Sequence, residues 1–327
     1  MRVLSLFDGI SCGRVAFDRA EIPVESYAAY EIDKHAITIS KKNHQDITHF
    51  GNVIKANFAI HKGIDILIGG SPCQGFSVAG KQLNFEDPRS RLYFEFERAL
   101  KQAKPRYFLL ENVCMKQEFA DIISERLGVY PVMINSALLS AQGRKRLYWT
   151  NIPGVTQPKD RGIELRDIIH ESNPRDKINI EPYKIPADKC IEILEKEVER
   201  GKVLRSSRGL ERYFVHGRLV KIGRPGDYVF GCLTPDRVNK RQNGQRFNTG
   251  EKFYTLTAMD KHGILTNGYI RRATPIECER LQTLPDNYTA GVPESQRYKC
   301  LGNAWTVDVI AHILSHIPSK EANQCKN

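Results

Sequence analysis

The chain has 327 residues, 41% hydrophobic and 27% charged, and its 49 lysines and arginines exceed its 38 aspartates and glutamates by 11. This composition excludes a disordered tail protein and a collagen-like protein, and the length predicts one large domain or two. The net charge of +11 favours a polyanionic partner, with nucleic acid the leading candidate, over a basic surface without a specific partner.

No apolar run approaches the roughly 20 residues needed to cross a bilayer, so we expect no membrane segment. Residues 1–7 contain one basic residue and a short β-rich run, which predicts a first core strand rather than a signal peptide. The eight cysteines include no CxxC-type pair and follow no secretion signal. We therefore expect reduced thiols in a cytoplasmic protein, with neither a metal site nor a disulfide framework.

The first third of the chain predicts alternating strands and helices. The predicted strands are residues 3–6, 24–30, 64–68 and 107–110, and the predicted helices are residues 13–20, 34–42 and 92–101. This order is typical of an α/β protein with a doubly wound, mostly parallel sheet. Ligands bind beyond the carboxyl ends of such strands, where this chain carries Asp8-Gly9, Glu31, Gly70-Ser71-Pro72-Cys73 and Glu111-Asn112.

The character of the sequence changes after Gly154. Residues 155–270 are expected to be irregular apart from a charged amphipathic stretch at 187–200, and two further helices are predicted at 275–281 and 306–315. Residues 201–252 hold twelve basic and four acidic residues and so carry +8 of the net charge. Seven Tyr and Phe residues lie between positions 213 and 254. This mixture suits contact with phosphates and bases, although a solvated loop region with a small aromatic core is the alternative.

A glycine-containing turn at residues 7–13 joins a strand to a helix, and Glu31 closes the next strand 22 residues after Gly9. The glycines allow close approach of the backbone, and the carboxylate can accept hydrogen bonds from ribose hydroxyls. The pattern indicates a nucleoside cofactor, either a nicotinamide dinucleotide or S-adenosylmethionine, with an ordinary tight turn as the alternative.

Three further motifs carry reactive groups. Cys73 follows a proline in a glycine-bounded loop at a strand end, where a nucleophile would be exposed, although most free cysteines are inert core residues. Glu111 follows an apolar strand, where a carboxylate can act as an acid or hydrogen-bond donor or form a structural salt bridge. Arg144 and Arg146 would point the same way in an extended segment. Two such arginines could grip an oxygen-rich ligand, order a carboxylate or lie on a solvated edge.

Taken in order, these motifs resemble those of the DNA (cytosine-5) methyltransferase family. The resemblance rests mainly on Ser71-Pro72-Cys73-Gln74 and Glu111-Asn112-Val113, and continues through residues 142–146, 280–286 and 302–303. Residues 140–154 and 302–305 are similar to the animal de novo catalytic domains. The Cys73 loop is closer to bacterial and phage restriction-modification enzymes, so we expect a prokaryotic or phage enzyme.

The resemblance implies a DNA (cytosine-5-)-methyltransferase that transfers a methyl group from S-adenosyl-L-methionine to C5 of a flipped cytosine in duplex DNA. The transfer would pass through a covalent Cys73 adduct and leave S-adenosyl-L-homocysteine. It also implies a Rossmann-like methyltransferase sheet, in the α/β class, built from residues 1–154 and 271–327. Residues 155–270 would form a smaller, irregular target-recognition domain. The expected role is sequence-specific restriction-modification or phage DNA protection, with any cognate endonuclease acting separately.

The resemblance and the basic insert together assign the site residues. Cys73 is the nucleophile, Glu111 holds cytosine N3, Arg146 binds cytosine O2, and Arg144 orders Glu111 or the nucleophile loop. The expected cofactor-binding residues are Phe7, Asp8, Gly9, Ile10, Glu31, Ile32, Asn52, Val53, Pro72, Leu92, Asn303, Ala304 and Trp305. The expected DNA-binding residues are Gln74, Ser77, Arg205, Arg208, Arg237, Lys240, Arg241 and Arg246.

Two departures from the family pattern bear on the cofactor. Asn52 stands where Asp is usual, and its side-chain oxygen could still accept from the adenine amino group, with weaker binding. Ala304-Trp305 replaces a common Ser-Val, so Trp305 is expected either to wall the methionine part of the cofactor or to pack the last helix.

Three other functions are considered. A nicotinamide-dependent oxidoreductase leaves Cys73, Glu111 and the basic insert unexplained. A non-catalytic DNA-binding regulatory homologue would usually lack Cys73 or Glu111. A tRNA cytosine-5 methyltransferase shares the chemistry, but the basic insert fits a DNA target-recognition region better.

Overall fold

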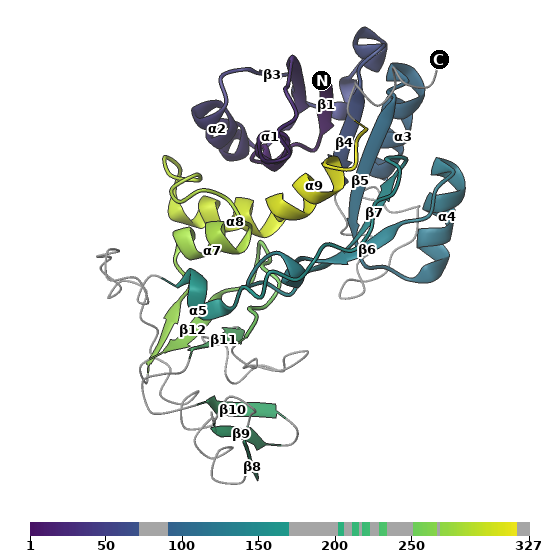
Figure 1. Ribbon diagram of the computed structural model, residues 1–327. Helices are drawn as coiled ribbons and strands as arrows, with labels where there is room; N and C mark the ends of the chain where they lie inside the picture. The colour runs from purple at the N-terminus through teal and green to yellow at the C-terminus, as the bar shows by residue number, and fades with distance from the viewer. Residues whose placement is uncertain are drawn as a thin grey trace.

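The computed structural model describes residues 1–71, 91–169, 202–205, 211–215, 218–222, 229–233, 251–266 and 269–318. Its centre is a seven-stranded sheet with the order β3-β2-β1-β4-β5-β7-β6 (Figure 1). The strands are β1 (Arg2–Leu6), β2 (Ser26–Tyr30), β3 (Ile47–His49), β4 (Ile66–Gly70), β5 (Tyr107–Val113), β6 (Val132–Asn135) and β7 (Lys145–Thr150). The first five in sheet order run parallel, and β7 is antiparallel to both β5 and β6. The expected α/β fold with a mostly parallel sheet is confirmed.

Helices cover both faces of this sheet, because successive side chains of a strand point to opposite sides. On β1, Val3 packs in the apolar cluster that includes α1 (Cys12–Arg19), α2 (Lys34–Asn43) and α9 (Val307–Leu314). Leu4 and Leu6 pack in the opposite cluster, with α3 (Arg91–Ala103) and α4 (Gln117–Leu127). The shorter helices are η1 (Val53–Lys55), η2 (Phe58–His61), η3 (Ser136–Leu138) and α5 (Leu165–Ile168). No helix in the described ranges is long and apolar enough to cross a bilayer.

The expectation that residues 155–270 are irregular is wrong for their described strands. β8 (Lys202–Arg205), β9 (Glu211–Val215) and β10 (Arg218–Ile222) form one antiparallel sheet, and β11 (Val229–Leu233), β12 (His262–Thr266) and β13 (Tyr269–Arg272) form another. These strands are four or five residues long, and charged residues interrupt most of them. They lack the apolar runs that identify the buried parallel strands. The predicted amphipathic stretch at 187–200 lies outside the described residues.

The last described helices pack beside the beginning of the chain. α7 (Pro275–Leu281) has the predicted bounds, because Thr274 and Glu277 form a reciprocal capping box and Pro275 stands at the helix start. α8 (Glu294–Asn303) follows, and α9 lies against α1, where Asp308 forms an ion pair with Arg19 (Figure 1). These late helices thus reach the part of the sheet where β1 meets its first loop.

Residues 253–257, which lie within the predicted insert at 155–270, contact this body. The Gly143 amide donates to the Phe253 carbonyl at 2.9 Å, and the Thr255 hydroxyl donates to the Gly143 carbonyl. On its other side the segment touches α8 so closely that a Cβ at Gly302 would lie 2.3 Å from the Ala258 nitrogen. Only glycine permits this contact between two backbones.

The Gly302→Ala substitution is therefore expected to lower the free energy of unfolding by about 3 kcal/mol, because rigid backbone blocks the added methyl group. Without that contact, alanine would stabilise a helix relative to glycine. Gly143→Ala is the matched control, since its Cβ would meet only the Phe253 carbonyl at 3.6 Å. Urea denaturation measures both, and a Gly302→Ala protein as stable as wild type would contradict the contact.

Candidate active site

The loops after β1, β2 and β3 lie together at one edge of the sheet, since these neighbouring strands are parallel. In the first loop, Phe7, Gly9 and Ser11 have left-handed backbones with φ of 56°, 59° and 62°. Such angles are costly for Phe and Ser and occur mainly where function requires a particular loop shape. The Asp8 amide donates to the Tyr30 carbonyl at 3.1 Å, which joins the first loop to the end of β2.

Glu31 connects the first two loops through its carboxylate. One oxygen accepts from the Gly9 amide at 2.8 Å, and the other accepts from the amides of Ile32 and Asp33 at 2.7 and 2.8 Å. The predicted pairing of a glycine turn with an acid is thus present as direct contact. Backbone donors fix the carboxylate, which keeps lone-pair sites available for a ligand hydroxyl.

Asn52 follows β3 and caps η1. Its side-chain oxygen accepts from the Ile54 amide at 2.9 Å, and one lone pair of that oxygen stays available for an amino group. Ile32 lies at the same edge with 73% of its surface exposed, while Val53 is buried. Arg98 of α3 donates to the Val53 carbonyl at 2.8 Å and so holds this loop.

These residues fit the adenosine end of the expected cofactor. The fixed carboxylate suits a ribose diol. The exposed apolar Ile32 and the amide side chain of Asn52, in the loops after β2 and β3, suit a flat base with an amino group. Within the described ranges, no three His, Cys, Asp or Glu side chains gather as a metal ion would require.

Asp8 points inward rather than toward this edge. Ser5 and Tyr27 donate hydroxyl hydrogen bonds to one of its oxygens at 2.6 and 2.8 Å, and Ser11 donates to the other. Burial raises the pKa of Asp8 to about 6, with these hydroxyls opposing the rise and Glu31 adding to it. The side chain therefore supports the strained loop from behind.

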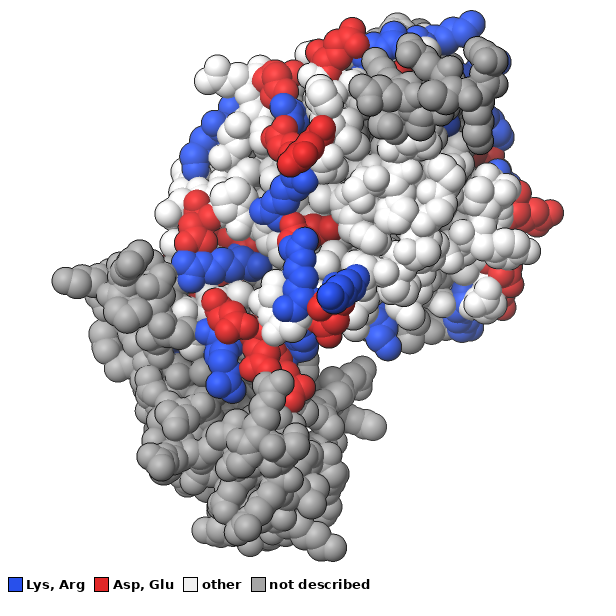
Figure 2. All heavy atoms as spheres, viewed as in Figure 1, with Lys and Arg blue, Asp and Glu red and all other residues white. Residues whose placement is uncertain are grey.

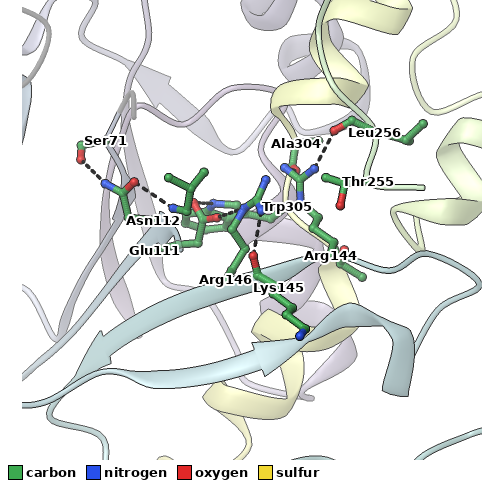
Figure 3. A network of polar contacts seen from close by, with 12 residues as sticks. Ser71, Glu111, Asn112, Arg144, Lys145, Arg146, Thr255, Leu256, Ala304 and Trp305 are labelled. Atoms are coloured by element: carbon green, nitrogen blue, oxygen red, sulfur yellow. Dashed lines mark hydrogen bonds and ion pairs between the residues drawn. The ribbon is translucent and has the colours of Figure 1, made fainter. Parts of the chain in front are cut away.

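Glu111 lies at the end of β5, between two donors (Figure 3). The Arg146 Nε lies 3.0 Å from its Oε1, and the Trp305 indole nitrogen donates to its Oε2 at 3.1 Å. Arg146 comes from β7, where it is opposite Val113 in the antiparallel register. The contact between Glu111 and Trp305 is one that the sequence did not predict.

Asn112 ties the next loop to the same edge. It is buried, and its side-chain amide donates to the Ser71 hydroxyl at 3.1 Å (Figure 3). Ser71 is two residues before Cys73, so this bond fixes the start of the loop that carries the predicted nucleophile.

Arg144 faces a different direction from Arg146. Its buried guanidinium donates to the carbonyls of Leu256, Gly302 and Ala304 at 2.8, 3.3 and 3.0 Å (Figure 3). The family resemblance assigns Arg146 to cytosine O2 and Arg144 to Glu111 or the nucleophile loop. In the structure Arg146 forms an ion pair with Glu111. Arg144, directly before β7, instead donates to the segment at residues 253–257 and to the turn that carries Trp305.

The structure describes some of the remaining predicted site residues, and the others lie outside the described residues. Leu92 is partly buried in α3, Ala304 is buried and Asn303 is exposed at the end of α8. Arg205 is in β8, and only its backbone is described. The predictions that lie outside the described residues are Pro72, Cys73, Gln74, Ser77, Arg208, Arg237, Lys240, Arg241 and Arg246.

Comparison with known proteins identifies the family. The sequence profile of the C-5 cytosine-specific DNA methylases matches residues 1–319, and the chain belongs to this family of S-adenosylmethionine-dependent enzymes. Two bacterial or phage relatives are similar to it, as the Cys73 loop predicts. The orphan methyltransferase M.SPRI of Bacillus phage SPR is 28% identical over 97% of each chain. The type II methyltransferase M1.ScrFI of Lactococcus lactis subsp. cremoris is 30% identical over 94% of this chain and 76% of its own.

Solved structures agree in fold. A putative DNA modification methyltransferase encoded within an E. coli prophage covers 100% of both chains with a TM-score of 0.64 and 19% identity. The S. pombe Dnmt2 methyltransferase covers 96% of this chain and 97% of its own, with a TM-score of 0.61 and 18% identity. At these identities the likeness supports the architecture alone.

The raised pKa of Asp8 predicts a pH-dependent stability. The folded protein holds this proton more tightly than an unfolded chain with a pKa near 3.8, so the contribution is complete below about pH 4 and is lost as the pH rises through about 6. The difference in unfolding free energy between wild type and Asp8→Asn should therefore fall by about 2–3 kcal/mol between pH 4 and pH 7. Denaturant titrations across this range measure it.

Asp33→Asn is the control of opposite sign. Burial acts to raise the pKa of Asp33, but Lys299 and the amides of His35 and Ala36 together lower it. The advantage of wild type over Asp33→Asn should therefore grow as the pH rises from the folded pKa to the unfolded one. A pH-independent difference between wild type and Asp8→Asn would contradict the inward placement of Asp8.

Proposed function

We propose that this enzyme methylates carbon 5 of a flipped cytosine in double-stranded DNA through a covalent Cys73 adduct. One observation carries the proposal: Glu111 and Arg146 lie at the same sheet edge as Gly70 and Ser71, which lead into the Cys73 loop. A paired carboxylate and guanidinium there suit the N3 and O2 of a pyrimidine whose C6 is attacked by a nearby thiolate.

The residues of the chain act on the base in sequence. Carbon 5 of cytosine is a poor nucleophile, so the Cys73 thiolate adds to C6 and makes the ring enamine-like at C5. Glu111 binds N3 and favours its protonation, while Arg146 binds O2. A base such as a water molecule removes the C5 proton, and elimination releases Cys73. When bound, S-adenosyl-L-methionine supplies the sulfonium methyl group that C5 receives.

The cofactor is proposed to lie along the edge formed by the loops after β1, β2 and β3. Its nucleoside would contact Phe7, Gly9, Ile10, Glu31, Ile32, Asn52 and Val53, and its methionine end would approach Pro72, Leu92 and residues 303–305. Asp8 and Arg144 contribute to this site by holding the first loop and the Trp305 turn. Both are positioning residues in this proposal.

Duplex DNA is proposed to bind mainly through a target-recognition domain at residues 155–270, inserted between catalytic segments 1–154 and 271–327. Residues 201–252 carry +8 of the net charge, which leaves +3 on the rest of the chain. On the face that Figure 2 shows, basic and acidic side chains of the described residues alternate along one band. The insert is thus the region whose charge suits a phosphate backbone.

The names of two relatives support a proposed biological role. They are named as orphan methyltransferases of phages and type II methyltransferases. We propose that this enzyme marks a specific DNA sequence in the cytoplasm of a bacterium or a phage-infected cell. The mark would protect that DNA from an endonuclease that acts separately.

The chemistry predicts a trapped adduct. A duplex containing 5-fluorocytosine cannot lose its C5 substituent, so wild type with cofactor should form a covalent complex that survives denaturing electrophoresis, and Cys73→Ser should form none. Glu111→Gln should slow adduct formation by roughly 10²–10⁴-fold through the loss of N3 protonation, as is typical when a proton-transfer group is removed. Transfer of a labelled methyl group to adenine, or to tRNA in preference to duplex DNA, would contradict the assignment.

Removing basic residues of the insert should weaken DNA binding without affecting cofactor binding. Alanine at Arg237, Lys240, Arg241 and Arg246 should weaken duplex binding and reduce the slope of log K against log salt by about 0.9 for each phosphate that is no longer neutralised. Cofactor affinity should stay unchanged. The matched control replaces four exposed lysines of the catalytic segments, Lys41, Lys62, Lys104 and Lys116.

Equal effects of the two sets on the salt slope would show a nonspecific charge effect. Loss of cofactor binding in the insert variant would contradict the proposed division into domains. Fluorescence anisotropy with labelled duplex and calorimetry with cofactor measure the two affinities.

A further inference from the structure

The carboxylate of Glu111 receives one donor on each oxygen, and the two donors come from distant parts of the chain. Arg146 stands 35 residues after Glu111, on the neighbouring strand, whereas Trp305 stands 194 residues after it, between α8 and α9. In Figure 3 the Trp305 ring and the Arg146 guanidinium both reach the Glu111 carboxylate. One of the two donors to Glu111, the proposed catalytic acid, therefore comes from the turn between α8 and α9.

Gly70 makes room for this contact. A Cβ at Gly70 would lie 2.8 Å from the indole nitrogen of Trp305 and 2.9 Å from Oε2 of Glu111, in close contact with both bonded atoms. The φ of Gly70 is not positive, so its backbone conformation does not itself require glycine. The missing side chain is what allows the indole to approach the carboxylate.

The turn that presents Trp305 is fixed on both sides. Arg144 donates to the carbonyls of Gly302 and Ala304, and Thr306 donates its hydroxyl to the buried Gln282 side chain at 3.0 Å. The ring itself lies near α1, since a Cβ at Gly13 would be 3.6 Å from the Trp305 Cζ3. A side chain held in this way loses little further entropy when it bonds to Glu111.

We propose that Trp305 is a positioning residue that orients Glu111 toward the substrate base, a role that rests on the proposed function. An indole N–H only donates, so it fixes Oε2 as an acceptor without taking the proton that Glu111 manages. Together with Arg146 it defines the plane of the carboxylate. Each oxygen keeps one further lone-pair site for a proton or for the base.

The first experiment detects the contact without DNA. The chain has two tryptophans, so ¹⁵N-labelled protein gives two indole N–H signals in a TROSY spectrum. Trp149, whose indole donates to Ser124 at 2.9 Å, is the internal reference. Glu111→Ala and Gly70→Ala should each shift the Trp305 signal upfield and leave the Trp149 signal in place, and Trp305→Phe assigns the signals.

The second experiment separates positioning from cofactor contact. Trp305→Phe keeps an aromatic ring but loses the N–H, so single-turnover methyl transfer at saturating cofactor and DNA should slow about tenfold, as expected for a hydrogen bond to a charged group. The Kd for cofactor should change by less than about threefold. Gly70→Ala should show the same pattern, and Trp305→Ala should lose both rate and cofactor affinity.

Trp149→Phe is the matched control. It removes an indole hydrogen bond of similar length from a fully buried site, so it should lower thermal stability and leave the single-turnover rate unchanged. A wild-type rate for Trp305→Phe, or a defect confined to the cofactor Kd, would overturn the positioning role. So would an unmoved Trp305 signal in Glu111→Ala. Wild-type protein that methylates no DNA would instead overturn the proposed function, while the spectra still test the contact.

Discussion

The buried guanidinium of Arg144 is the interaction on which the arrangement of this site depends. It donates to carbonyls of residues 256, 302 and 304, more than a hundred residues further along the chain. A buried charge is costly unless it is hydrogen-bonded, and three backbone carbonyls supply such bonds to Arg144. The same contacts fix the segment at residues 253–257 and the turn before α9. One side chain thus joins the three parts of the chain that meet at the sheet edge.

A second set of buried polar groups extends this junction. Gln142 accepts from the Leu256 amide at 2.7 Å and donates to the Leu281 carbonyl, and Gln282 donates to the Leu301 carbonyl at 2.8 Å. Such groups must find partners when buried, so they define one arrangement of the segments rather than many. The consequence is a rigid frame behind Glu111. The edge where we propose the cofactor binds is held in a similar way, with Glu31 bonded to three backbone amides and Asp8 to three hydroxyls.

The sequence predicts those helices, strands and turns that are determined by residues close together in the chain. The strands of the parallel sheet follow from short apolar runs, and α7 follows from Pro275 and its capping residues. The glycine turn and Glu31 meet as their spacing indicates. The contact of Trp305 with Glu111 could not be predicted, because it depends on how residues 194 positions apart pack. The insert's strands could not be predicted either, because charged residues obscure their short alternating patterns. The one local signal for the Trp305 contact was tryptophan in place of the family's usual valine.

The proposed activity is a cysteine-dependent methylation of cytosine at C5, in which buried polar contacts would hold Glu111 toward the base. The most direct test is bisulfite sequencing of plasmid DNA from cells that express the wild-type chain or Cys73→Ser. If the proposed activity is correct, cytosines within one short sequence context resist bisulfite conversion in the wild-type sample. Such cytosines are absent from the Cys73→Ser sample. Protection that persists without Cys73, or full conversion of every cytosine in DNA exposed to abundant folded wild-type protein, would contradict it.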